Sequence, residues 1–463
     1  MRLWSISLRN LRIRLVATML TALAILVATG LYAAILLMAE QTKQRYEGSI
    51  GGYQAVVGPK DASQLEIVLN TIFHVGDSPG LFPLKVCDDL RNSRVGRRAQ
   101  VHYAIPQARG DSVSKYNFPV VATLDEQFTL FERGGAPLKF AAGGAFAFSY
   151  DDLRKMGTEL AAYESARRTG EVAVPPRPKL DPAWRKCVVG ARVARKLGLS
   201  LGDTVTPVHG KMNEFGFHEH PEAACKVVGI LEPTNSPLDV TIFLPLGVHL
   251  LIDGHEGGVF VVEIPAGKNP DDAKTLPVDV DQIGLTAVVV DPKDHFGAQF
   301  LRKEFGMRPE AQVCWPQVEV PKFLRTMGNI ADALSVVAWL VLFGASLSIA
   351  AVIYNTMNER RREIAIMRSL GARRAQIFAI IVLEAGLLSL FGALLGVAAC
   401  HLCALFLGEF VEDMTGVHLD WAQFQLWEIW LVCGVGAIGA VAGVLPAIKG
   451  STTQVADNLA QNY

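Results

Sequence analysis

The sequence predicts a helical membrane protein with four transmembrane helices and a large α+β extracytoplasmic domain between spans one and two. Three observations indicate this fold class: four long apolar stretches, a long mixed segment between the first two of them, and an uneven distribution of arginine among the short segments. Of the 463 residues, 50% are hydrophobic and 19% are charged, which is typical of a membrane protein that carries a water-soluble domain. A net charge of −1 does not indicate a nucleic-acid partner.

The apolar stretches predict spans at 15–39, 330–355, 377–407 and 426–448, since a bilayer crossing takes roughly 20 helical residues. For the first span the alternative is a cleaved signal peptide, but its apolar core exceeds the roughly 7–15 residues of such a segment. Residues 1–14 interleave apolar side chains with arginines. We expect them to form an interfacial helix at the cytoplasmic face, or else a simple positive flank.

The orientation follows from arginine, which is concentrated in 1–14 and 356–376, whereas 408–425 carries acids and neither Lys nor Arg. Short cytoplasmic segments are the ones enriched in Lys and Arg. We therefore expect a multi-pass protein of the inner (plasma) membrane with both termini, including the tail 449–463, in the cytoplasm. The domain 41–326 and the short loop 408–425 are expected on the periplasmic side.

The domain 41–326 is long enough for one large or two medium domains, and we expect two subdomains. Alternating or β-branched runs predict strands at 53–57, 101–105, 119–123, 226–231, 240–244, 259–264 and 285–290. Helical patterns are interleaved at 63–72, 125–131, 191–197 and 294–304. Within this domain, Gly198 is expected to cap the C-terminus of the helix 191–197.

The cysteines expected outside the cytoplasm are Cys87, Cys187, Cys225 and Cys314, which allow three disulfide pairings that the sequence does not distinguish. A zinc site formed by His218, His220 and Cys225 is one interpretation of the histidine-rich stretch, because histidine and cysteine suit zinc. The alternative is an ordinary polar loop between strands.

The sequence contains neither the phosphate-binding motif G-x-x-x-x-G-K-[ST] nor the zinc-hydrolase motif H-E-x-x-H. We therefore expect no catalytic residue and no cofactor bound by this chain. Within the spans, Glu384 and His401 suggest an interfacial or interhelical hydrogen bond rather than a substrate path. Asp332 and Glu428, at span ends, are expected to face water. The glycine pairs 392/396 and 439/443 predict close helix packing, within one chain or in a dimer.

The segment 358–374 is basic and amphipathic and lies between two spans. If it is helical, Ile364, Met367 and Gly371 share one face at i, i+3 and i+7, with arginines along the border. Gly371 suits the residue that ends such a helix. The pattern is typical of a partner-binding helix, and the alternative is a positive loop that binds anionic lipid.

The stretch Glu359-Arg-Arg-Arg-Glu-Ile-Ala-Ile-Met-Arg-Ser-Leu-Gly-Ala372 resembles the signature segment of ABC transporter permeases of the MacB/FtsX/LolC-LolE group. Glu384-Ala385 and Gly443-Val-Leu-Pro-Ala447 are similar to two further motifs of that group. The periplasmic segments 189–203 and 226–231 look like its MacB-like periplasmic domain. The C-terminal tail keeps only the general shape of the family pattern.

The resemblance implies a permease that couples ATP hydrolysis by a separate ATPase subunit, which holds the ATP and Mg, to movements of the periplasmic domain. These movements would extrude or release a substrate from the outer leaflet or the periplasm. The implied partners are that ATPase, a second permease copy or a related permease, a periplasmic lipoprotein or membrane-fusion protein, and membrane lipid. The implied coupling-helix contacts with the ATPase are Glu359, Arg360, Arg361, Arg362, Glu363, Ile364, Met367, Arg368, Leu370 and Gly371. An FtsX-type regulatory complex that moves no substrate is the alternative, and a membrane-anchored enzyme is a third class.

Overall fold

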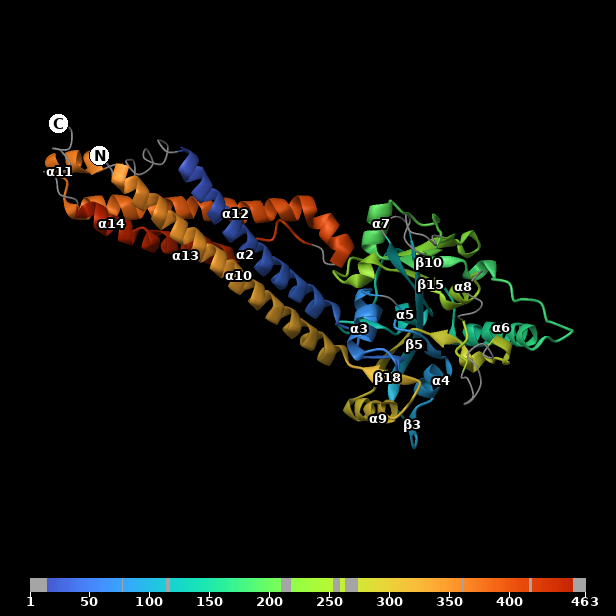
Figure 1. Cartoon of the computed structure of the whole chain (residues 1–463). Coiled ribbons are helices and arrows are strands. Elements are labelled where there is room, and N and C mark those ends of the chain that lie inside the picture. The colour runs from blue at the N-terminus through green and yellow to red at the C-terminus, as the bar shows by residue number, and fades with distance from the viewer. Residues whose placement is uncertain are drawn as a thin grey trace. The chain divides into compact units, whose positions relative to one another are not determined.

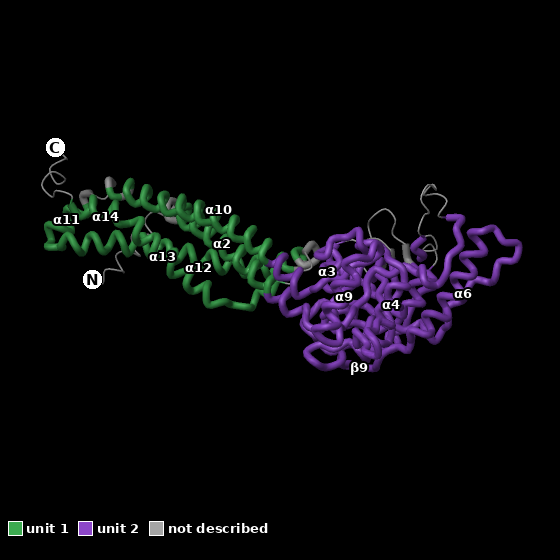
Figure 2. Tube along the Cα trace, turned by 90° about the horizontal axis from the view of Figure 1, so that it is seen from below, with its two compact units in different colours: residues 1–43, 325–463 green, residues 44–324 purple. Residues whose placement is uncertain are grey.

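The computed structural model describes residues 15–76, 78–113, 117–209, 218–252, 259–262, 274–359, 361–415 and 419–452. The expected interfacial helix at 1–14 and residues 453–463 of the tail lie outside these ranges. The chain forms two compact units, which are coloured separately in Figure 2. Unit 1 comprises Met1–Lys43 with Arg325–Tyr463, and unit 2 comprises Gln44–Leu324.

Unit 1 is helical (Figure 1). The helices that form it, some of which extend past its boundary residues, are α2 Leu15–Ser49, α10 Pro316–Glu359, α11 Arg361–Ser369, α12 Arg374–Thr415, α13 Leu426–Ala442 and α14 Val444–Ser451. Within the described ranges, four stretches are long and apolar enough to cross a membrane: Met19–Ser49, Pro316–Asn355, Arg374–Gly408 and Leu426–Ser451. The four predicted spans are therefore confirmed. The helices run further than the apolar stretches because helix-compatible polar residues continue the pattern at their ends.

Glycines let the helices of unit 1 approach closely. A Cβ added to Gly396 of α12 would lie 2.7 Å from the backbone oxygen of Leu26 and 3.0 Å from the backbone nitrogen of Gly30, both on α2. On α13, a Cβ at Gly439 would lie 3.2 Å from the backbone oxygen of Ala385 on α12. Both predicted glycine pairs therefore serve contacts between helices of the same chain.

Unit 2 is an α+β domain, as predicted. Its helices are α3 Gln64–Phe73, α4 Lys85–Arg91, α5 Glu126–Thr129, α6 Tyr150–Thr169, α7 Ala191–Leu197, α8 Leu246–Leu250 and α9 His295–Gly306. Its strands are β1 Ala55–Pro59, β2 Phe82–Pro83, β3 Arg94–Val95, β4 Arg98–Ala99, β5 Val101–Val113, β6 Phe118–Thr123, β7 Glu132–Arg133, β8 Ala136–Pro137, β9 Phe140–Gly143, β10 Lys186–Val189, β11 Thr204–Val205, β12 Val208–His209, β13 His218–Glu219, β14 Cys225–Leu231, β15 Ile242–Pro245, β16 Gly284–Leu285, β17 Ala287–Pro292 and β18 Ala311–Cys314.

The long strand β5 joins two parts of the main sheet, whose order is β11-β14-β10-β15-β6-β5-β17-β1-β18. Residues 101–107 of β5 pair with β17, and residues 108–113 pair with β6, both antiparallel. One hydrophobic cluster packs on the β6 side of β5 and includes Val189, Val227 and Leu244. The main sheet thus runs continuously through unit 2, and the division into two subdomains stays a prediction.

Local signals place several elements correctly. The hydroxyl of Ser63 accepts the backbone N–H of Glu66 and caps α3. Gly198 ends α7 in the left-handed conformation with a φ of 65°, as predicted. The predicted strand at 259–264 is reduced to one bridge between Phe260 and Ile283 in the described residues, which stop at 262 in this stretch.

Candidate functional site

The helix α11 occupies the amphipathic segment between α10 and α12. Its C-terminus forms a Schellman motif, in which the N–H of Gly371 donates to the carbonyl of Arg368 and the N–H of Ala372 donates to that of Met367, at 3.1 and 3.0 Å. Gly371 has a φ of 98°, which a residue with a side chain rarely adopts. The predicted helix end at Gly371 is therefore confirmed, and it separates α11 from α12.

One face of α11 is buried inside unit 1. Ile364 is 4% exposed and Ala365 is 1% exposed. Ile364 belongs to a core cluster that also contains Met357 of α10, Ile377 of α12 and Ala447 of α14, and Met367 packs against this cluster. The structure thus places Ile364 and Met367 against the chain's own spans rather than on an exposed stripe, and their predicted contact with an ATPase stays a prediction.

The opposite face of α11 carries exposed apolar side chains. Ile366 is 43% exposed and Leu370 is 82% exposed. Together with the exposed Glu363 they lie on one face of the helix, at positions i, i+3 and i+7. Arg373 and Arg374, just beyond the helix, are exposed as well. We call Glu363, Ile366 and Leu370 the outer face of α11. The side chains of Glu359, Arg360, Arg361 and Arg362 lie outside the described residues, so their predicted partner contacts stay predictions.

The buried face of α11 meets the helix ends of three other elements. α14 lies at the same end of unit 1 as α11 (Figure 1). Lys449 of α14 lies over the Tyr354 ring of α10, 3.7 Å from its centroid, and also donates to the Tyr354 hydroxyl. Gly450 of α14 leaves room for the side chain of Met357, which would overlap any added Cβ. The helices α10 and α14, which both contribute residues to the cluster around Ile364, are thus also in direct contact with each other.

A buried polar pair lies between α12 and α13. The Nε2 atom of His401 is 3.1 Å from Oε2 of Glu428, and Nδ1 of His401 donates to the carbonyl of Trp421 at 2.6 Å. His401 is 7% exposed and Glu428 is 5% exposed. The expectation that Glu428 faces water is wrong, because this carboxylate caps α13 through the N–H of Gln425 and pairs with His401. Asp332 is exposed, as predicted.

The candidate zinc ligands lie partly outside the described residues, which omit the His218 side chain. His220 Nδ1 lies 3.0 Å from Glu222 Oε1, and burial raises the pKa of Cys225 to about 12. Among the side chains that the structure describes, no three His, Cys, Asp or Glu gather as metal ligands. All seven cysteines are free thiols.

Comparison with known proteins identifies relatives of this region. Residues 335–455 match the family model described as FtsX-like permease C-terminal, and this range contains α11. An ABC transporter permease of Methanocaldococcus jannaschii, itself uncharacterized, is 24% identical over 278 residues, which cover 57% of this chain and 59% of that protein.

Two further relatives match over shorter ranges. The macrolide export ATP-binding/permease protein MacB 2 of Aeromonas hydrophila is 29% identical over 31% of this chain and 21% of its own length. The ABC transporter permease YknZ of Bacillus subtilis, also uncharacterized, is 29% identical over 24% of this chain and 27% of its own. The chain thus spans less than two thirds of each of these relatives. The matches confirm the resemblance to MacB and FtsX permeases predicted from residues 359–372.

Proposed function

We propose that this chain, a relative of the MacB and FtsX permeases, is the membrane subunit of an ABC transporter whose ATP is hydrolysed by a separate ATPase subunit. The observation that carries the proposal is the division of α11 into two faces. One face is fixed in the core of the spans, and the other presents Ile366 and Leu370 to the surroundings. Exposed apolar side chains beside arginines are typical of protein contact surfaces.

The positive-inside pattern supports a cytoplasmic position for α11, where an ATPase could reach it. ATP-driven closure of the ATPase would then displace the outer face. Because Ile364 packs with Met357, Ile377 and Ala447, the displacement would pass to α10, α12 and α14. Tightly packed interiors transmit such displacements, since they deform little. Gly371 would act as the joint that lets α11 turn relative to α12.

In this mechanism unit 2 is the part that handles the substrate. It is inserted between α2 and α10, so that movements of these spans would reach it through the chain. We place unit 2 in the periplasm, where its movements would release a substrate from the outer leaflet or the periplasm. His401 and Glu428 are paired with each other, which agrees with a substrate path that avoids the membrane centre.

A second permease copy, or a related permease, would pack against α2 and α10. A groove of about 470 Å³ between these helices is lined by apolar and small residues, among them Leu20, Val27 and Gly344. Leu20 is 63% exposed and Val27 is 54% exposed. Small residues beside large ones favour helix association in lipid.

The test replaces Leu370 with Asp and measures the affinity of the full-length permease for its ATPase. Burying an exposed leucine at an interface contributes about 1.5–3 kcal/mol, so we expect a loss of about tenfold or more. The matched control is Met307→Asp in unit 2, because Met307 is 85% exposed. Unchanged affinity in Leu370→Asp, or an equal loss in the control, contradicts the proposed contact.

A further inference from the structure

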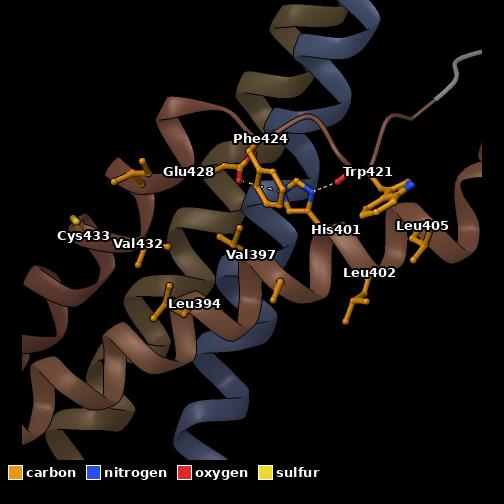
Figure 3. A pocket seen from close by; sticks show the side chains of 12 residues that line it. Leu394, Val397, His401, Leu402, Leu405, Trp421, Phe424, Glu428, Val432 and Cys433 are labelled. Atoms are coloured by element: carbon orange, nitrogen blue, oxygen red, sulfur yellow. Dashed lines mark hydrogen bonds and ion pairs between the residues drawn. The ribbon is translucent and has the colours of Figure 1, made fainter.

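We propose that the groove between α12 and α13 binds one phospholipid, with an acyl chain along α12 and a hydrogen-bond-donating headgroup at Glu428. The groove encloses about 600 Å³ (Figure 3). This volume lies within the usual range of ligand pockets, about 300–1,000 Å³. The proposal does not depend on contact between α11 and an ATPase.

The shape of the groove suits a single acyl chain. Its α12 wall is one helix face, formed by Leu394, Val397, Ala398, His401, Leu402 and Leu405. Residues 394 to 405 extend over about 16 Å at 1.5 Å per residue. A bilayer core is about 30 Å thick, so the wall is about one leaflet deep. Val432 and Cys433 of α13 form part of the opposite wall (Figure 3).

The groove lies on helices that meet the length and composition of membrane spans. Leu402 is 54% exposed and Ile429 is 61% exposed, so both would contact hydrocarbon rather than water. A cavity with apolar walls holds water poorly, and an empty one forfeits dispersion contacts. An acyl chain from the surrounding leaflet restores those contacts and needs no polar partner.

At the polar end of the groove, the protons on His401 and Glu428 determine which further hydrogen bonds can form. The carbonyl of Trp421 can only accept, so Nδ1 of His401 carries a proton. The contact between Nε2 and Glu428 needs one further proton, held on either partner. Both ring nitrogens are therefore used. The carboxyl group, whose Oε1 takes one N–H from Gln425, keeps lone pairs that can accept further hydrogen bonds.

A headgroup that reaches Glu428 is therefore favoured when it carries N–H or O–H donors. An ethanolamine ammonium has such donors, whereas the trimethylammonium of choline has none. Phe424 lies over His401 with ring centroids 4.4 Å apart, and Trp421 lies beside it (Figure 3). Tryptophan is enriched at the level of lipid headgroups, which places this end of the groove at the bilayer surface.

The test reconstitutes the full chain with equal amounts of ethanolamine and choline phospholipid and counts retained lipids by native mass spectrometry. We expect a preference of about tenfold for the ethanolamine lipid, the scale of one hydrogen bond donated by a charged ammonium group. Glu428→Gln should weaken the preference while retaining bound lipid, because it leaves one accepting oxygen, which already takes the N–H of Gln425. Glutamine also fits this capping position, so the start of α13 is preserved.

Leu402→Trp should fill the groove and remove the retained lipid, whereas Leu347→Trp on α10, where Leu347 is 56% exposed, should not. A photo-crosslinker at position 402 provides a readout that needs no bulky variant, and we expect a lipid adduct. Equal retention of both lipids by the unmodified chain overturns headgroup recognition. An adduct with a second protein copy shows that the groove is a protein interface and overturns lipid binding.

Discussion

The packing of α13 against α12 predicts that Gly439→Ala destabilises unit 1, although alanine is the better helix former. A Cβ at Gly439 would overlap the Cβ and Oγ of Ser389, closer than Cβ atoms essentially ever come to another atom. Ser389 has little room to move, because it is fully buried and its hydroxyl donates to the carbonyl of Ala385 at 2.9 Å. The two helices must therefore separate.

The magnitude combines two opposing effects. Overpacking a close contact costs about 1–3 kcal/mol, and overlap with atoms fixed near the backbone places this site at the upper end. Replacing glycine with alanine inside a helix contributes up to about 1 kcal/mol in the opposite direction. We expect a net loss of about 2 kcal/mol. Gly434→Ala, on the same helix, should stabilise unit 1 by the helix-propensity contribution alone, because an added Cβ there meets nothing within 4 Å.

The assay is thermal unfolding of the full chain in detergent, followed by tryptophan fluorescence, since Trp427 and Trp430 lie on α13. The two variants should differ by about 3 kcal/mol, which corresponds to about 6–12 °C at 2–4 °C per kcal/mol. Ser389→Gly in the Gly439→Ala background should restore much of the loss, because it removes both overlapping atoms. Equal stability of Gly439→Ala and Gly434→Ala would refute the close contact.

Two further predictions concern unit 2. Burial, and to a lesser extent the charge of Arg109, holds the pKa of His74 well below its usual 6.5. As the pH drops below about 6.5, the unfolded chain therefore binds a proton at His74 and the folded chain does not. The free energy of unfolding should fall accordingly. Between pH 7.0 and 5.5 the unfolding temperature of His74→Asn should fall less than that of the parent, and an equal fall would contradict this origin. Burial also raises the pKa values of Cys187 and Cys225, so mass spectrometry should find neither thiol alkylated by maleimide at pH 8 until the chain is unfolded. Labelling of Cys225 in the folded protein would contradict its burial.

The sequence predicted elements whose signal is local. The four spans follow from length and composition, and α7 begins and ends at the predicted residues 191 and 197. Gly371 was predicted to end α11 because a left-handed turn there favours glycine. In each case the physical cause lies within a few residues of the element.

Elements whose signal is weak or distant were missed. α6 was not predicted, because its sequence is polar and charged and shows little apolar periodicity, yet its N-terminus carries a capping box of Ser149 and Asp152. That box was the signal that could have located the helix. The interhelical hydrogen bond expected of His401 is present, but its partner Glu428 was missed, because a position near a span end indicated contact with water.

The outer face of α11 could not be derived from periodicity for a reason specific to its sequence. Residues 364–367 are all apolar, so every side of the helix carries a hydrophobic side chain. The period of 3.6 identifies faces but not which face is covered. Contacts with α10, α12 and α14 cover Ile364, and this leaves Ile366 and Leu370 outside. A charged residue in place of Ile364 would therefore destabilise the helix bundle even without a partner. A substitution on the outer face of α11 instead tests ATPase binding without disturbing the fold.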